Sequence, residues 1–454
     1  MKTRAFLTLV LLLAACAPSL RDDATSRRMI AETTLPPMKL FAPITPQPQP
    51  IANRDLVADF LDLSFEMESG KQLPVLTRFE GPISLRVTGA PPATLARDLR
   101  LLLDRLQREA GIAITVTQNP DAQITIEAVS RRTLQKVLPQ AACFVVPNVS
   151  SLSEFRSLRR SPKTDWALLT TRTRVTVVVP NDASPQEVRD CLHEEVAQAL
   201  GPLNDLYRLP NSVFNDDNVH TILTDFDMLI LRATYAPELT SGMGREDVAA
   251  KLPAIFARIN PNSAAPARAQ SARTPIPFTQ AIQTALGPGT GLANRQTAAD
   301  RAVQIATQAG WNDTRRGLAH YTRGRILQVT DPRAAPGEFR LADRFYAISN
   351  QTRLHRAFVA SQLASYALAA GEPARARALV TPYIPLAKTA QNAALLATLQ
   401  LLRAEALRAE GRVPQADALR LDSLGWARYG FGADWAVQGK LREIATLRAQ
   451  TPPS

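Results

Sequence analysis

Residues 191–205 constrain the fold of this 454-residue chain more than any other stretch. A helix is predicted there because Ser184 can cap it, Pro185 suits its first turn, and Gly201, followed by a second proline, forms a stop signal. The unbroken β-branched run at residues 175–179 precedes this helix and predicts a buried strand. The sequence therefore predicts a core strand that leads into a capped helix.

Polar residues with metal-binding atoms gather on this helix and just past its end. Glu194 and Gln198 are four residues apart and share one helix face, and Glu195 lies beside the first of them. Asn204 and Asp205 follow immediately after the expected turn. This spacing is typical of a metal site, with Glu195 as a candidate general base and the other four residues as candidate ligands.

The spacing resembles the metzincin peptidases, whose HExxHxxGxxH motif places two metal-binding His residues one turn apart and a catalytic Glu beside the first. In this chain the catalytic Glu is matched by Glu195 and the Gly by Gly201, whereas all three His positions are replaced, by Glu194, Gln198 and Asn204. The resemblance therefore implies a metzincin-like domain with a degenerate metal motif.

A second alignment would take His193 and Glu194 as the His-Glu pair of the motif. It would put Ala197 where the second ligand belongs, and it would move the Gly out of step. The first alignment is preferred for that reason.

Two downstream segments strengthen the resemblance. Residues 212–214 look like the metzincin Met-turn, with Phe214 in place of the Met, and residues 223–235 look like its final helix. Over residues 50–260 the chain resembles an uncharacterised domain family of proteobacterial lipoproteins, domain of unknown function 2927. The resemblance implies a fold for residues 51–260 rather than an activity.

Apolar periodicity predicts the other elements of this domain. Helical stripes occur at residues 54–66 and 93–109, and strand-like runs at residues 83–87, 112–116 and 124–128. We therefore expect an α+β metzincin-like domain followed by an all-α helical-repeat domain.

The N-terminus has the form of a bacterial lipoprotein signal. Residues 1–16 contain two basic residues, an apolar run and Leu-Ala-Ala-Cys16, a lipobox in which Cys16 is lipidated. An ordinary secretory signal with a coincidental Cys is the alternative. Residues 17–50 are Pro-rich and are expected to form a semi-rigid tether. These features predict a lipid-anchored protein of the cell envelope that faces the periplasm, on the outer membrane in preference to the inner.

A linker at residues 261–277 separates this half from an Ala-, Leu- and Arg-rich region, residues 278–450. Residues 363–376 and 402–416 share one helix-Gly-Pro-helix pattern, which looks like a tetratricopeptide-type array; a plain helical bundle is the alternative. Residues 264–454 hold 24 basic and 12 acidic residues, against 29 of each before them. We expect this half to bind a protein partner, and with an export signal present we expect no nucleic acid partner.

The cysteine and histidine residues limit the chemistry further. With Cys16 lipidated, Cys143 and Cys191 form an even pair in an oxidising compartment, which predicts a disulfide; two buried free thiols are the alternative. Only four His residues exist, and two of them lie in the helical half, so a three-His zinc site cannot form in the first domain. No cofactor is expected, although oxygen ligands of this kind would suit Ca²⁺, Mg²⁺ or Mn²⁺.

Asp225 and Asp227 could pair as catalytic carboxylates, but their place after Thr224 favours a capping role. Three functional hypotheses follow from the sequence. The preferred one is a non-enzymatic envelope lipoprotein that binds a peptide or protein. A metal-dependent peptidase with Glu195 as general base is the second, and a structural protein that binds peptidoglycan or lipopolysaccharide is the third.

Overall fold

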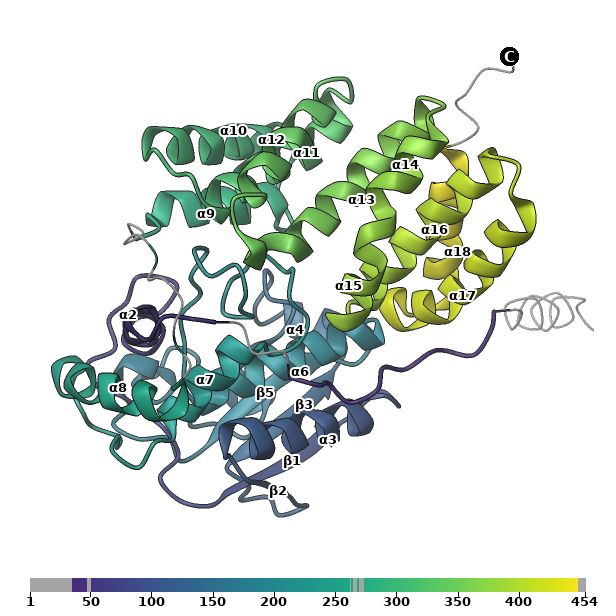
Figure 1. The fold of residues 1–454 in the computed structure, drawn as a ribbon. Coiled ribbons are helices and arrows are strands. Elements are labelled where there is room, and N and C mark those ends of the chain that lie inside the picture. The colour runs from purple at the N-terminus through teal and green to yellow at the C-terminus, as the bar shows by residue number, and fades with distance from the viewer. Residues whose placement is uncertain (1–34, 47–49, 262, 264–267, 269–272, 448–454) are drawn as a thin grey trace, which may run out of the picture. The chain divides into compact units, whose positions relative to one another are not determined.

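The computed structural model describes residues 35–46, 50–261, 263, 268 and 273–447 of the chain (Figure 1). The expected signal and lipobox, residues 1–16, lie outside the described residues. Residues Met1–Pro36 and Pro37–Ser454 form two separate units, and the second unit contains both the α/β domain and the helical domain.

A five-stranded mixed sheet forms the centre of the first domain. The strand order is β2-β1-β3-β5-β4, and every neighbouring pair is parallel except β4 and β5. The strands are β1 (Ile83–Gly89), β2 (Ile114–Val116), β3 (Ile124–Val129), β4 (Phe144–Pro147) and β5 (Val175–Pro180). Every residue of β5 is buried, as expected for a β-branched strand inside a largely parallel sheet that is covered on both faces.

Helices cover both faces of this sheet. The larger core lies on the face where Val175, Val177 and Val179 meet helices α2, α3, α6, α7 and α8, whereas Val178 points into a smaller core with α4 and α5. These helices are α2 (Asn53–Ser64), α3 (Leu95–Arg105), α4 (Arg131–Gln135), α5 (Leu152–Leu158), α6 (Pro185–Leu200), α7 (Asp225–Thr234) and α8 (Arg245–Ile259). The expected elements are present, and their ends are shifted by a few residues. The expected helix at residues 93–109 is divided into α3 and one π-helical turn, Leu106–Ala110.

The rest of the described chain is helical, as the sequence predicts. Its α-helices are α9 (Ile276–Leu286), α10 (Leu292–Gln308), α11 (Thr314–Thr330), α12 (Ala335–Tyr346), α13 (Arg353–Ala369), α14 (Pro373–Val380), α15 (Ile384–Thr389), α16 (Ala393–Ala409), α17 (Val413–Phe431) and α18 (Asp434–Thr446). Gly371 and Gly411, both at positive φ, end α13 and α16, and a proline opens the helix that follows each. Among the described helices, none is long and apolar enough to cross a membrane.

Part of the expected tether packs against the folded domains. Residues 37–46 run along α3, α6 and α17, where Phe41 is 6% exposed and stacks on Trp426 with ring centroids 4.5 Å apart. Backbone groups hold it as well, because Lys39 N donates to Gly425 O at 3.0 Å and Gln391 Nε2 donates to Ala42 O at 2.8 Å. We call residues 37–46 the strap.

Direct polar contacts join the two domains beside the strap. The Tyr429 hydroxyl donates to Asp98 Oδ2 at 2.7 Å, and Gln186 Nε2 donates to Asn392 Oδ1 at 3.2 Å. These side chains come from α17, α3, α6 and the residue before α16, so α6 lies at the seam between the domains.

Candidate functional site

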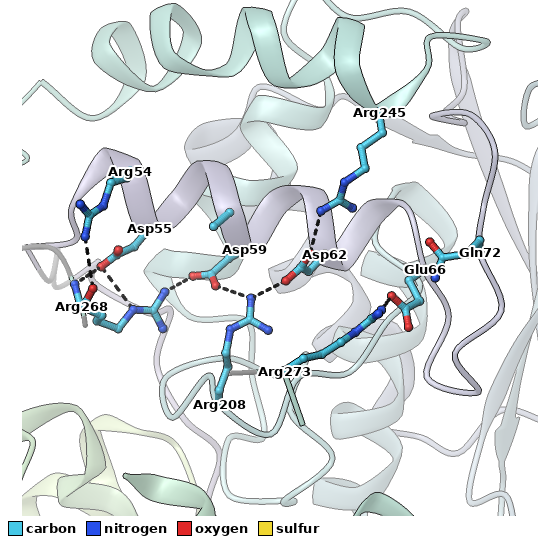
Figure 2. Close-up of a pocket in the computed structure, with 11 residues that line it drawn as sticks. Arg54, Asp55, Asp59, Asp62, Glu66, Gln72, Arg208, Arg245, Arg268 and Arg273 are labelled. Atoms are coloured by element: carbon cyan, nitrogen blue, oxygen red, sulfur yellow. Dashed lines mark hydrogen bonds and ion pairs between the residues drawn. The ribbon is translucent and has the colours of Figure 1, made fainter. Parts of the chain in front are cut away.

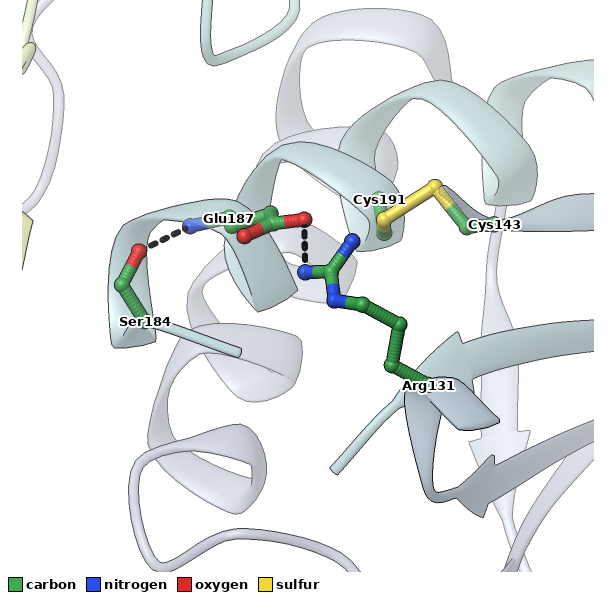
Figure 3. The surroundings of a disulfide bond; sticks show 5 residues. All are labelled: Arg131, Cys143, Ser184, Glu187 and Cys191. Atoms are coloured by element: carbon green, nitrogen blue, oxygen red, sulfur yellow. Dashed lines mark hydrogen bonds and ion pairs between the residues drawn. A yellow bond between two sulfur atoms is a disulfide. The ribbon is translucent and has the colours of Figure 1, made fainter. Parts of the chain in front are cut away.

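The site helix α6 is fixed at its start and along its length (Figure 3). The Ser184 hydroxyl accepts a hydrogen bond from the Glu187 backbone N–H at 3.2 Å, and the Glu187 carboxylate pairs with Arg131. Cys191 is linked to Cys143, which directly precedes β4, with their Cα atoms 5.9 Å apart. The predicted disulfide is confirmed, and it ties α6 to the antiparallel edge of the sheet.

His193 of α6 binds the backbone of another segment. It is buried, and its Nδ1 accepts a hydrogen bond from Leu223 N at 3.1 Å. Burial, followed by the nearby Arg189 and Arg105, lowers the pKa of His193 well below its ordinary value, so the ring is a neutral acceptor at physiological pH. This contact is consistent with the preferred alignment, in which His193 is not a ligand.

The structure brings the carboxyl groups of Glu194, Glu195 and Asp205 close enough to affect one another. Burial, followed by Glu195, raises the pKa of Glu194 well above its ordinary value. Burial and then Asp205 raise the pKa of Glu195 to about 8, and burial and then Glu194 raise that of Asp205 well above its ordinary value. Burial and the neighbouring like charges therefore favour the protonated form of each of these groups.

Two further carboxyl groups that the sequence analysis did not place in the site lie near this set. Glu68, in the loop after α2, and Asp216, before α7, each raise the pKa of Glu194 and Asp205. Asp216 accepts from the Tyr207 hydroxyl at 3.0 Å, and Glu68 accepts from Gln283 Nε2 of α9 at 2.6 Å. We call Glu68, Glu194, Glu195, Asp205 and Asp216 the carboxyl cluster.

The two amide residues of the predicted ligand set have different surroundings. Asn204 Nδ2 donates to Asp62 O at 2.9 Å, and its Oδ1 accepts from Asp205 N at 3.0 Å, so both ends of its side chain bind the backbone. Gln198 is half-buried, and its backbone carbonyl accepts from Arg172, whereas its side chain has no hydrogen bond with any described residue. Asn204 thus acts as a loop brace rather than as a free oxygen donor.

These donors do not fit a peptidase zinc. Zn²⁺ in peptidases is held mainly by imidazole, whereas this set offers no imidazole, one amide that is committed to the backbone and one other amide beside its carboxyls. Among the residues that the structure describes, no group of three or more His, Cys, Asp or Glu side chains is placed to hold a metal ion.

Local packing explains Gly201 and the turn that contains Phe214. A Cβ atom built on Gly201 would lie 2.9 Å from Thr234 Cγ2, so the end of α6 needs a glycine to approach α7. Phe214 is fully buried, and its turn is held because Ser212 Oγ donates to Asp227 Oδ1 at 2.6 Å. Asp227 also completes a capping box with Thr224, which confirms its structural role.

Apart from the carboxyl cluster, a polar hollow of about 420 Å³ runs along α2 (Figure 2). Its acidic residues pair with arginines from other segments: Arg208 Nη2 lies 2.9 Å from Asp59 Oδ1 and 3.0 Å from Asp62 Oδ2, and Arg245 Nη2 lies 2.8 Å from Asp62 Oδ1. Because its carboxylates already bind arginines of the same chain, this hollow offers little free charge to a ligand.

Fold and site together define an α/β domain with a largely parallel sheet and a buried carboxyl cluster, followed by a helical domain. Residues 53–254 match the model of a family described as "Protein of unknown function (DUF2927)". The predicted domain family is thus confirmed for that segment, which ends within α8. No curated protein and no solved structure matches the chain.

Proposed function

We propose that this chain is a non-catalytic, lipid-anchored protein of the bacterial cell envelope that binds another protein, with a degenerate metzincin-like domain as its first folded part. The observation that carries the non-catalytic part is the state of the motif residues. Asn204 binds the backbone at both ends, and burial raises the pKa of Glu194 and of Asp205. Asn204, which a peptidase of this pattern would turn toward a metal, is used here to hold the chain.

The fold supports a binding role. β4 ends the sheet beside α6, and an extended peptide can add to the edge strand of a sheet through its backbone. In the helical domain, the hairpins α9–α10, α11–α12 and α16–α17 pack on their neighbours along the chain, the arrangement that tetratricopeptide-like arrays use to present a protein-binding surface.

Elemental analysis and a proteolysis assay test the non-catalytic proposal on the purified full chain. We expect well below one equivalent of zinc, and cleavage of unstructured protein that does not differ between the wild type and Glu195→Ala. Asp104→Ala, which removes an exposed carboxylate of α3, is the matched control. Stoichiometric zinc together with proteolysis lost only in Glu195→Ala would replace the proposal with the peptidase.

One observation favours that peptidase as the second candidate. Glu195 is 5% exposed, and its Oε2 atom has no hydrogen-bond partner in the described part of the chain, although a buried carboxyl oxygen normally has one. A general base needs an oxygen of this kind, which is free to accept a proton from a water molecule. The assay above separates the two candidates, because only the second makes cleavage depend on Glu195.

Crosslinking in intact cells tests the envelope and binding parts of the proposal. We expect one stoichiometric protein partner with the wild-type chain, and loss of acylation and of membrane association in Cys16→Ser. Recovery of peptidoglycan or lipopolysaccharide alone would instead support the third hypothesis, and an acylated Cys16→Ser protein would contradict the lipobox prediction.

A further inference from the structure

A hollow of about 450 Å³ lies at the meeting point of the helical domain and the loop before α7. Its volume is within the range of about 300–1,000 Å³ that small-molecule sites occupy. α11 supplies a full face of it, because Leu318, Tyr321, Arg325 and Val329 follow one another at three- and four-residue spacing. It shares no residue with the carboxyl cluster.

The mouth of this hollow exposes apolar side chains to water. Leu286 of α9, Leu292 of α10 and Val329 of α11 all line it and are 45%, 44% and 68% exposed. Ile326 and Phe358 continue the apolar wall inward. An apolar chain that covered these groups would remove them from water, which stabilises a complex.

Two cations on the same wall have no carboxylate partner. Arg325 is exposed and makes no hydrogen bond or ion pair with any described residue. Arg295 is held in place because its Nε donates to Thr290 O at 2.9 Å and its Nη2 donates to Gly287 O at 2.6 Å. Both acceptors are neutral backbone carbonyls, so no carboxylate of a described residue compensates the charge of Arg295.

The one acidic side chain of the hollow is already satisfied by its own surroundings. Asp217 Oδ2 lies 2.8 Å from His355 Nε2 and accepts from Asn215 Nδ2 at 2.8 Å, while Oδ1 accepts from Val219 N at 3.0 Å. His355 is 1% exposed, and its Nδ1 has no hydrogen-bond partner among the residues that the structure describes. The hollow thus combines apolar walls, uncompensated positive charge and one unpaired polar atom in its lining.

We infer that this hollow binds a single-chain anionic amphiphile, the simplest of which is a fatty acid. The alkyl chain lies against Leu286, Leu292 and Val329, and the carboxylate binds Arg325 and Arg295. Arginine suits that head group because its planar fork can bind both oxygens of a carboxylate. The inference is independent of the proposed function, since it uses neither the motif helix nor the sheet edge.

Calorimetric titration with dodecanoate below its micellar concentration tests the inference. The protein is the full chain carrying Cys16→Ser, purified without detergent. We expect saturable binding to one site, and binding at least about tenfold weaker in Arg325→Gln, because the lost contact is a charge-assisted hydrogen bond. Arg344→Gln is the matched control, since Arg344 is equally exposed on α12 and lies outside the hollow.

A second pair of variants tests the apolar wall. Leu292→Glu should abolish dodecanoate binding, whereas Leu421→Glu, at an exposed leucine of α17 outside the hollow, should leave it unchanged. Equal losses in Arg325→Gln and Arg344→Gln would overturn the inference. So would dodecyltrimethylammonium binding as tightly as dodecanoate, or binding only of an acidic peptide and not of dodecanoate.

Discussion

Glu195 illustrates how burial and a neighbouring carboxyl group, Asp205, change the charge that a side chain carries. Its pKa rises from 4.5 to about 8 in the folded chain, so between these values the folded state holds a proton that the unfolded state releases. A carboxyl group with a raised folded-state pKa contributes its stability in full below the unfolded value and loses it as the pH rises toward the folded value. The carboxyl cluster therefore favours folding in mildly acidic conditions.

We predict that the free energy of unfolding of the wild type falls between pH 4.5 and 8, and that Glu195→Gln makes this fall shallower. Glutamine keeps the shape of a protonated glutamate and cannot ionise. Urea unfolding at several pH values measures the slope. Glu246→Gln, at an exposed glutamate of α8, is the control and should follow the wild type. An unchanged slope in Glu195→Gln would mean that Glu195 is ionised in the folded protein.

Gly201 matches the glycine of the motif, and its packing against α7 is enough to require a glycine there. We predict that Gly201→Ala destabilises the chain by about 1–3 kcal/mol, the usual cost of overpacking, because its Cβ would lie 2.9 Å from Thr234 Cγ2. Denaturant unfolding measures the loss. Gly439→Ala in α18, where a Cβ would meet nothing within 4 Å, should be neutral or slightly stabilising.

A double variant checks the cause of that loss. Thr234→Ser removes the methyl group that the new Cβ would strike, so it should recover part of the stability lost in Gly201→Ala. No recovery would assign the loss to the backbone of Gly201 rather than to the contact with α7.

At the scale of elements, the disulfide joins a helix to the edge of a sheet across 48 residues of sequence. We predict that Cys143→Ala with Cys191→Ala lowers the free energy of unfolding by about 4 kcal/mol at most, the chain-entropy value for a loop of this length. Urea unfolding should give nearly the same value for the reduced wild type and the double variant. Both cysteines being freely alkylated in the oxidised protein would contradict the bond.

The elements that the sequence predicted best are those with local signals. α6 follows from Ser184, Pro185 and Gly201, and the disulfide follows from an even cysteine count. The carboxyl cluster could be predicted only in part, because Glu68 and Asp216 come from separate loops. No spacing rule connects these loops to α6, since only the tertiary fold brings them together.

On the scale of the whole molecule, the strap had the weakest sequence signal and lies at the seam. Its proline content correctly argues against a helix or a central strand, but nothing in residues 37–46 names Trp426 and Tyr429 as its neighbours. Arg189 of α6 also lies over the Phe41 ring, 5.4 Å from its centroid. Contacts between residues so far apart in sequence are set by packing, which sequence periodicity does not report.

We predict that Phe41→Ala destabilises the chain by about 3 kcal/mol, the lower end of the cost of truncating a buried phenylalanine. Leu40→Ala is the control, because Leu40 is 42% exposed and should change stability by less than about 0.5 kcal/mol. Chemical denaturation measures both, and limited proteolysis near residue 41 should speed up only in Phe41→Ala. Equal stability of the two variants would show that the strap adds nothing to the seam.

The strap also has a mechanical consequence. If Cys16 is held in a lipid layer, tension on the chain reaches the bonds of Lys39, Phe41 and Ala42 before it reaches α2. Those bonds reach α17 and the residues before α16 as well as the α3 side, so a pull on the anchor is shared by both domains from the outset. A chain tethered this way would yield at its seam before its sheet.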